Sequence, residues 1–315
     1  MSEETFANAL ENRILLFDGA MGTEIQRYDP KSEDFPDGKD GFNDGLSITK
    51  PDWIKEIHRK YLRAGADCIE TNTFGSNKIK LDEYGFGSQT VELNQKNAEL
   101  ARSVCDEFTD RQRFVVGSMG PTGYLPSSND VDLGQMPLSE IRESFELQAE
   151  GLILGGVDAL LIETSQDILG VKLAVEASHA AMEKTGKKVT LISNVTLDQY
   201  GKKLLGTNVQ SEYTTITEIG IDIIEAGFPV ASKGDFEAVS EVSKILKKSI
   251  PCGLSRHIKK DIDACNEGLK SSKRFRIHTF ISTITLHMNH KLNTISEDVL
   301  QAITENITNA RQYTE

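Results

Sequence analysis

Short apolar runs and longer amphipathic stretches alternate along the whole chain. Runs rich in Val, Ile and Leu predict strands that are covered on both faces, at residues 14–19, 67–72, 114–118, 159–163, 189–194, 222–226, 251–255 and 276–280. Stretches with helical spacing predict helices, most clearly at residues 53–64, 90–108, 138–154, 168–184, 235–248 and 296–313. Strands that alternate with helices are typical of parallel α/β proteins.

Three of these units share a local pattern, at residues 65–70, 156–163 and 220–225. In each, a glycine ends a helix, an Asp leads into an apolar strand, and a Glu stands at the carboxyl end of that strand. About eight strands in such repeats predict a closed (β/α)8 barrel of the TIM type, with residues 1–315 forming one barrel. An open doubly wound sheet is the alternative, but the chain has no Gly-x-Gly-x-x-Gly motif to support it.

Composition narrows the class of protein. The chain has 315 residues, of which 38% are hydrophobic and 26% charged, so it can bury a core. Its apolar runs are too short to cross a membrane, and the N-terminus shows no secretory signal. The four cysteines form no Cys-x-x-Cys pair, which favours a reducing, cytoplasmic location.

Charge limits the partners and hints at a boundary. The formal net charge of −13 argues against a nucleic acid or an anionic membrane as the main partner. Nearly all of this charge lies in residues 1–218, whereas residues 219–315 are close to neutral. Such a shift marks either a fusion point or chance variation.

In a barrel, the chemistry belongs at the carboxyl ends of the strands. Asp18 ends the first predicted strand, where exposed N–H groups of Gly19 and Ala20 can hold a carboxylate while Asp18 holds an ammonium group. The alternative is a plain glycine-rich turn.

Glu163 follows an apolar strand and needs a cation, a proton or a ligand ammonium, unless a Lys or Arg of the chain pairs with it. Thr73 and Ser118 lie in polar strand ends of the same kind.

The last third offers a second set of polar strand ends. Arg256 can clamp a carboxylate with two hydrogen bonds, and His278 with Thr279 can bind or protonate an oxyacid, although an ordinary polar rim explains them too. His287 and His290 are close in sequence but lack an evident third metal ligand. Small buried core residues are the preferred interpretation of the cysteines, which are Cys68, Cys105, Cys252 and Cys265.

Ordered motifs in the first two-thirds of the chain carry a resemblance. They are Phe-Asp-Gly-Ala-Met-Gly-Thr at 17–23, Glu-Thr-Asn-Thr-Phe at 70–74, Gly-Ser-Met-Gly-Pro-Thr-Gly at 117–123, Ile-Glu-Thr at 162–164 and Asn-Val-Thr at 194–196. Residues 13–221 resemble the homocysteine S-methyltransferase barrel, most of all the homocysteine-binding module of cobalamin-dependent methionine synthases. The resemblance implies that Asp18, Glu163 and the backbone of Gly19 and Ala20 surround the amino-acid end of homocysteine. It adds three further substrate-site residues, which are Thr73, Ser118 and Asn194.

The same resemblance implies a zinc ion, but this chain lacks the cysteines expected to bind it. In that family, three cysteines hold zinc, which turns the homocysteine thiol into the reactive thiolate. Here Glu225-Ala-Gly-Phe228 stands where the first zinc cysteine is expected, and no Gly-Gly-Cys-Cys pair follows. Zinc is therefore expected from the family, but its ligands are absent and no metal ligand is assigned.

A second resemblance covers residues 220–311. Gly-Ile-Asp-Ile-Ile-Glu-Ala-Gly-Phe-Pro-Val-Ala-Ser at 220–232, Cys-Gly-Leu-Ser-Arg at 252–256 and Arg-Ile-His-Thr-Phe-Ile at 276–281 are similar to 2-isopropylmalate synthase. This implies 2-oxo-acid-binding roles for Glu225, Arg256, His278 and Thr279. The chain is thus predicted to be a chimera of about five strands from one family and three from the other, joined near residues 220–227.

Three functions follow. The first is methyl transfer to the homocysteine thiol in methionine biosynthesis, impaired by the missing cysteines, with the methyl donor a small molecule or a separate protein. The second is acyl transfer from acetyl-CoA to a 2-oxo acid, as in leucine biosynthesis. The third is a catalytically silent fusion barrel that binds an amino acid at most.

Overall fold

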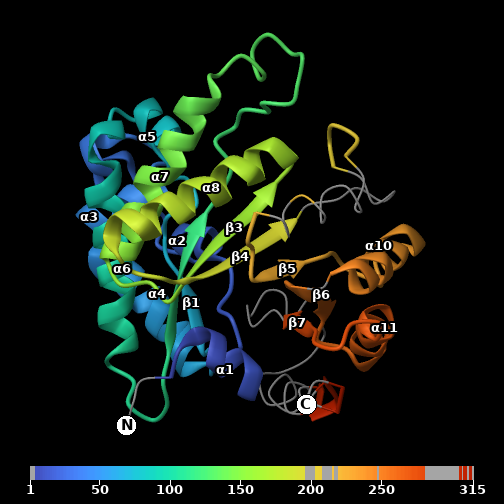
Figure 1. The fold of residues 1–315 in the computed structure, drawn as a ribbon. Coiled ribbons are helices and arrows are strands. Elements are labelled where there is room, and N and C mark those ends of the chain that lie inside the picture. Colours follow the sequence, from blue (N-terminus) through green and yellow to red (C-terminus); the bar gives the residue numbers. More distant parts are fainter. Residues whose placement is uncertain are drawn as a thin grey trace. The chain divides into compact units, whose positions relative to one another are not determined.

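The chain divides into two compact units, Met1–Asn194 and Val195–Glu315 (Figure 1). The computed structural model describes residues 4–195, 203–207, 215, 219–246, 248–280, 305–306, 308–310 and 312–313. Within these residues both units consist of parallel strands followed by helices, which confirms the α/β class.

The strands of the first unit lie in the order of the sequence. They are β1 (Cys68–Glu70), β2 (Phe114–Met119), β3 (Ala159–Ser165) and β4 (Thr190–Val195). The register pairs Cys68 with Phe114, and Val116 with Ala159, and both pairings are parallel. Nearly every side chain of β1 to β3 is buried, as the apolar runs predicted.

The predicted strand at residues 14–19 is wrong as a full strand. Only one parallel bridge, Phe17 to Cys68, is present in it. The physical reason is that a side chain takes part in the pairing. The Asp67 carboxylate accepts a hydrogen bond from the Leu16 N–H at 3.0 Å. The Leu16 carbonyl in turn accepts hydrogen bonds from the N–H groups of Asp67 and Cys68. The segment therefore lies beside β1, where a first strand is expected, but it forms a single bridge instead of a full ladder.

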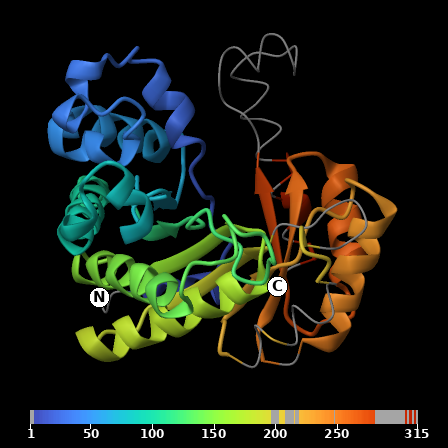
Figure 2. The same cartoon turned by 90° about the horizontal axis from the view of Figure 1, so that it is seen from above.

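Long helices cover these strands. They are α4 (Pro51–Arg63), α6 (Thr90–Cys105), α7 (Leu138–Leu154) and α8 (Ile168–Thr185), and their bounds agree with the predicted helices to within a few residues. Helices α6, α7 and α8 pack one against the next (Figure 2). A Cβ atom on Gly151 or Gly155 would lie within 2.5 Å of a backbone oxygen of α6, so only glycine allows α7 to approach so closely.

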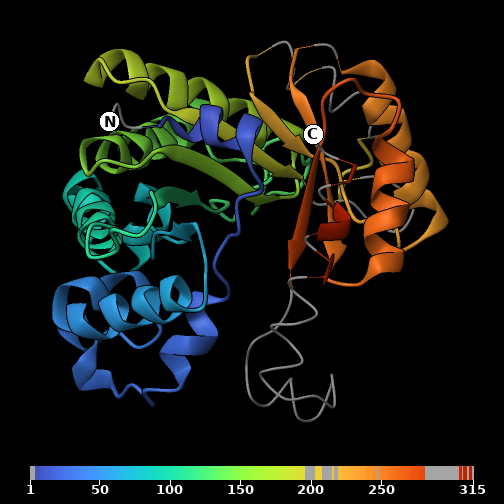
Figure 3. The same cartoon turned by 90° about the horizontal axis from the view of Figure 1, so that it is seen from below.

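A cluster of short helices was not predicted by the sequence. It gathers beside the strands of the first unit (Figure 3) and consists of α2 (Met21–Gln26), η1 (Ser32–Asp34), η2 (Pro36–Gly38), η3 (Asn43–Gly45), α3 (Leu46–Thr49), α5 (Lys78–Glu83) and η4 (Gly87–Gln89). Helix α1 (Phe6–Asn12) precedes them. An aromatic core holds the cluster: Phe42 stacks on Tyr84 with ring centroids 4.6 Å apart and touches Phe86 at 5.0 Å. Such short elements have no periodicity long enough to be recognised.

The internal repeat has a structural explanation. Gly65 and Gly156 adopt φ values of 108° and 89°, which end the preceding helices in a conformation that favours glycine. The following Asp then binds the backbone of the neighbouring strand: Asp158 accepts from the Val115 N–H at 2.7 Å, as Asp67 does from Leu16. The repeated Asp therefore fixes the register at the amino end of the strands.

The second unit contains β5 (Ile223–Glu225), β6 (Ile250–Arg256) and β7 (Arg276–Phe280), again parallel. Helices α10 (Lys233–Ile245) and α11 (Lys259–Leu269) lie side by side against these strands (Figure 2). The first half of the predicted helix at 296–313 lies outside the described residues. Across the part of the chain that the structure describes, no helix combines the length and the apolar character needed to cross a membrane.

Asp67 generates the first prediction. It is 4% exposed, and besides the Leu16 N–H it binds Arg13 at 3.0 Å and Arg111 at 2.7 Å. An Asp67→Asn variant keeps the shape but loses the charge that both guanidinium groups face. We expect the free energy of unfolding to fall by about 2–3 kcal/mol, as measured by urea denaturation followed through the fluorescence of Trp53, the one tryptophan of the chain.

The matched control is Glu83→Gln. Glu83 makes an exposed ion pair with Lys80 at 2.8 Å, and such surface pairs contribute at most about 1 kcal/mol. Equal losses in the two variants would contradict the role assigned to Asp67.

Candidate functional site

Asp18 lies at the carboxyl end of the strand-like segment and is fixed to β1. Its N–H donates to the Cys68 carbonyl at 3.0 Å, and its Oδ2 accepts from the Glu70 N–H at 3.0 Å. The Tyr61 hydroxyl donates to the Ala20 carbonyl at 3.2 Å, and a Cβ atom on Gly19 would lie 3.0 Å from that hydroxyl. Gly19 and Ala20 are exposed, so their backbone N–H groups can be reached by a ligand.

Negative charge gathers around Asp18. Burial raises the pKa of its carboxyl well above the usual value, and the charges of Glu70 and Glu163 raise it further. Burial, and next the charge of Asp18, raise the pKa of the neighbouring Tyr61 hydroxyl. The negative charges that act on Asp18 make its surroundings favourable to a positively charged ligand group.

Glu163 is tied to this cluster through Ser118. The Ser118 hydroxyl donates to Glu163 Oε1 at 2.6 Å, which joins the ends of β2 and β3. On the other side, Thr73 donates to the Ser118 carbonyl at 2.8 Å, and the Thr71 hydroxyl accepts from the Ser118 N–H at 3.1 Å. The structure therefore brings the predicted Thr73, Ser118 and Glu163 together. Thr73 is fully buried, and its hydroxyl binds the Ser118 carbonyl rather than facing solvent.

Thr164, directly after Glu163, has a φ of 58°. A β-branched residue in the left-handed region is strained by about 1–3 kcal/mol and persists only where its surroundings hold it there. The strained peptide sets the direction in which the chain leaves Glu163. Sequence reasoning missed this feature, because Ile-Glu-Thr is an ordinary strand composition.

Asp44 is a second residue that the sequence did not indicate. Its Oδ1 accepts from the Gly75 N–H at 3.0 Å and from the Ser76 hydroxyl at 2.9 Å, while the Asn43 carbonyl accepts from Asn72 at 2.8 Å. Burial raises the pKa of the Asp44 carboxyl. These bonds fix the loop after β1 that carries Thr73. No signal in the sequence links Asp44 to a loop some thirty residues later.

Asn194 lies near the end of β4 and is half-buried. It shares with Asp18, Ser118 and Glu163 a position at or just after the carboxyl end of its strand in the first unit. The expected substrate-site role of Asn194 stays a prediction.

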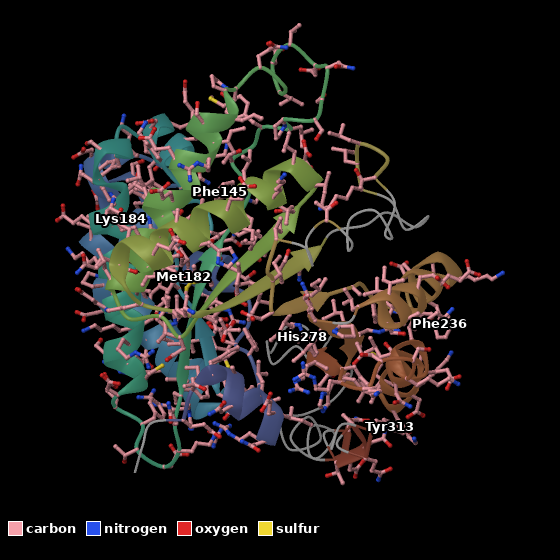
Figure 4. All side chains as sticks on the ribbon, viewed as in Figure 1. Phe145, Met182, Lys184, Phe236, His278 and Tyr313 are labelled. Atoms are coloured by element: carbon pink, nitrogen blue, oxygen red, sulfur yellow. The ribbon has the colours of Figure 1, made fainter. Side chains whose placement is uncertain are left out.

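The predicted residues of the second unit form their own group at the ends of β5 to β7. His278 (Figure 4) places its Nδ1 2.5 Å from Glu225 Oε2. Arg256 donates to Asp261 at 2.6 Å and lies over the Phe228 ring, 5.6 Å from its centre, and the bond to Asp261 raises the pKa of the guanidinium.

These contacts refine the two expected roles in the second unit. Arg256, the last residue of β6, binds Asp261 in the first turn of the helix that follows, α11. The Thr279 hydroxyl lies 3.1 Å from His257 Nδ1, so it also has a partner within the chain.

The cysteines do not suit a zinc ion. All four are buried, two in each unit, and burial raises the pKa of every one of these thiols. Zinc binds thiolates, so these residues do not fit the metal that the family resemblance implies. No group of three metal-binding side chains occurs in the part of the chain that is described.

The comparisons with known proteins decide the family. The family model described as homocysteine S-methyltransferase matches residues 15–251, three-quarters of the chain. The chain belongs to the homocysteine S-methyltransferase family. A second model, described as HMGL-like, matches residues 199–315, so the last part of this family member also carries the pattern of another family. The predicted mixed origin is supported to that extent.

Relatives agree with this assignment. The chain is 40% identical over 219 residues to the methionine synthase of Mycobacterium tuberculosis, and 39% identical over 217 residues to that of Mycobacterium leprae. These matches cover 69% and 68% of this family member but only 18% of each relative. The chain thus spans less than a fifth of the curated relatives that it matches.

Solved structures confirm the fold. The metallated form of the homocysteine methyltransferase MmuM from Escherichia coli matches with a TM-score of 0.65 and 18% identity, over 88% of this chain and 95% of that one. A B12-independent methionine synthase from Shewanella sp. W3-18-1, in complex with selenomethionine, matches with a TM-score of 0.50 and 13% identity, over 85% and 88%. The predicted TIM-type α/β fold is confirmed.

The raised pKa of Asp18 predicts how ligand binding depends on pH. An ammonium group binds the ionised carboxylate, so affinity for an amino acid should fall as the pH drops through the raised pKa, earlier than with an ordinary Asp. Near that pH, binding should also displace a proton from Asp18. Calorimetry in two buffers of different ionisation enthalpy, repeated across the pH range in which the protein stays folded, measures that proton release. Asp18→Asn should abolish it, and a wild-type affinity with no pH dependence would contradict the assignment.

Proposed function

We propose that the first unit binds homocysteine at the carboxyl ends of its strands, as the acceptor side of a homocysteine S-methyltransferase. The observation that carries the proposal is a pair of fixed carboxylates at the strand ends of the first unit, Asp18 bound to the Glu70 N–H and Glu163 bound to the Ser118 hydroxyl, within a chain of this family. The ionised carboxylates bind the ammonium group of the amino acid. The exposed N–H groups of Gly19 and Ala20 bind its carboxylate.

The four buried cysteines do not fit a zinc ion, so methyl transfer on this chain would proceed from the free thiol. The homocysteine thiol loses its proton to solvent, and the resulting thiolate attacks the methyl carbon of a donor. A sulfur–carbon bond forms while the bond between the methyl group and the donor breaks. A thiol of ordinary pKa is only a few per cent thiolate at neutral pH, so transfer on this chain is slow compared with a site that stabilises the thiolate.

The methyl donor comes from outside this chain. The chain spans 18% of the methionine synthases that it matches. A small methylated molecule or a separate methyl-donor protein would supply the group, as the sequence predicted.

Affinity for homocysteine tests this proposal. Asp18→Asn and Glu163→Gln each remove one charged partner of the ammonium group, so each should weaken homocysteine binding by about tenfold or more in calorimetry. The control is Glu225→Gln in the second unit, which should bind like the unaltered protein. Circular dichroism establishes that all three variants are folded. Wild-type affinity in both Asp18→Asn and Glu163→Gln would refute the site.

The two family matches support a mixed origin. We infer that residues 13–220 derive from the methyltransferase family and residues 221–315 from a family similar to 2-isopropylmalate synthase. The overlap of the two matches, residues 199–251, brackets the join expected near residues 220–227. Both patterns describe a parallel strand followed by a helix there, so an exchange at that point keeps the alternation of elements.

A second candidate function rests on the second unit. The HMGL-like match and the contact of His278 with Glu225 favour acyl transfer from acetyl-CoA to a 2-oxo acid. This activity should appear as release of coenzyme A that requires both a 2-oxo acid and a divalent metal, and that His278→Gln abolishes. Failure with a panel of small 2-oxo acids would remove this candidate. Absence of both activities in monodisperse protein would identify the chain as a catalytically silent barrel.

A further inference from the structure

We propose that this chain selects its ligand by the amino-acid end alone and without zinc, so that it binds homocysteine, methionine and a sulfur-free amino acid of similar length about equally well. The inference rests on the proposed function for the amino-acid site and goes beyond it, because it concerns the sulfur end of the ligand. It defines the ligand class as α-amino acids, recognised by their ammonium and carboxylate groups.

The thiols of the first unit cannot reach a ligand. Cys68 is fully buried in β1, where its backbone pairs with Phe17 and Phe114. Cys105 lies at the end of α6, 3% exposed, with its Sγ directed at the Phe114 carbonyl at 3.9 Å. Both side chains fill the layer between strands and helices rather than face a ligand at the strand ends.

The thiols of the second unit are equally enclosed. Cys265 is fully buried on α11, and a Cβ atom on Gly253 would lie only 2.4 Å from its Sγ. Cys252 is 7% exposed at the middle of β6, in register with Glu225 and Arg276. Burial keeps both of these thiols protonated at neutral pH by raising their pKa. Neither unit holds more than two cysteines, so a site of three cysteines cannot form within one unit.

The buried cysteines therefore give the sulfur end of the ligand no zinc-bound partner that would distinguish a thiol from a thioether. Zinc favours a thiolate strongly over a methylated sulfur, because the thiolate is charged and soft. Without such a bond, a thiol is only a weak hydrogen-bond donor and a thioether a weak acceptor. Replacing either by a methylene group changes little in the binding energy.

The amino end, in contrast, has charged partners within reach. Asp18 accepts from the Glu70 N–H at 3.0 Å, and Glu163 accepts from the Ser118 hydroxyl at 2.6 Å, so both carboxylates are held at strand ends of the first unit. A charged hydrogen bond to such a group contributes about 1.5–3 kcal/mol, far more than a neutral contact with sulfur. Removing the amino group from the ligand should therefore weaken binding by at least about tenfold, whereas removing the sulfur should change it little.

The experiment compares four ligands on the full chain by calorimetry. They are L-homocysteine, L-methionine, L-norleucine and 4-mercaptobutanoic acid, which is homocysteine without its amino group. Each titration is run under a non-chelating reductant, once with EDTA and once with one equivalent of zinc chloride. Zinc stoichiometry of the size-fractionated protein is measured by mass spectrometry.

We expect the three amino acids to agree within about threefold, 4-mercaptobutanoic acid to bind at least about tenfold more weakly, and zinc or EDTA to change none of these values. The protein should carry well below one zinc per chain. Cys252→Ala should leave all affinities unchanged, whereas Asp18→Asn should weaken the three amino acids by the same factor.

The outcomes separate this inference from the proposed function. Homocysteine that binds more than about tenfold tighter than norleucine, or that loses affinity in EDTA, would overturn the inference and leave the amino-acid site intact. Failure of all three amino acids to bind would refute the proposed function itself.

Discussion

The buried carboxylate of Asp67 is the constraint on which the first unit depends. It binds two guanidinium groups and the Leu16 N–H, and in doing so it holds the segment before Asp18 beside β1. That segment makes only one bridge of its own, so the side chain replaces most of a missing ladder. Asp67 therefore helps to position Asp18 at the site, because its side chain accepts a hydrogen bond that backbone pairing would otherwise provide.

The elements with long, regular patterns could be predicted from the sequence. The seven strands named within the described residues, and the helices α4, α6, α7, α8 and α10, all agree with the predicted ranges to within a few residues. The strand at residues 14–19 could not, because its apolar run says nothing about Asp67, fifty residues later. The short helices between Met21 and Gln89 escaped for a related reason: their order comes from the aromatic contacts of Phe42, which are tertiary.

The candidate site was predicted in its charged residues but not in its supports. Asp18 and Glu163 stand out in the sequence because a carboxylate that follows an apolar strand needs a partner for its charge. This pattern is local, so it can be recognised without knowing the fold. Asp44 and the strained Thr164 are supports whose role depends on a distant loop or on a backbone angle. Arg256 also has a partner that its place after a strand did not reveal: Asp261, five residues later, binds it.

The boundary between the two family matches also separates the residues assigned to the amino-acid end of the ligand from the cysteines expected at its sulfur end. Each residue assigned to the amino-acid end, from Asp18 to Asn194, lies in the first unit, within the part that matches the methyltransferase family. The zinc cysteines that the resemblance implies would follow residue 220, where the chain also takes the HMGL-like pattern and places Glu225 at a strand end. A join in that region can keep the alternation of strand and helix, because parallel βα units are alike locally. Under the proposed function, such a join separates the residues that would recognise the amino acid, which lie on this chain, from the zinc cysteines that would activate its sulfur, which it lacks.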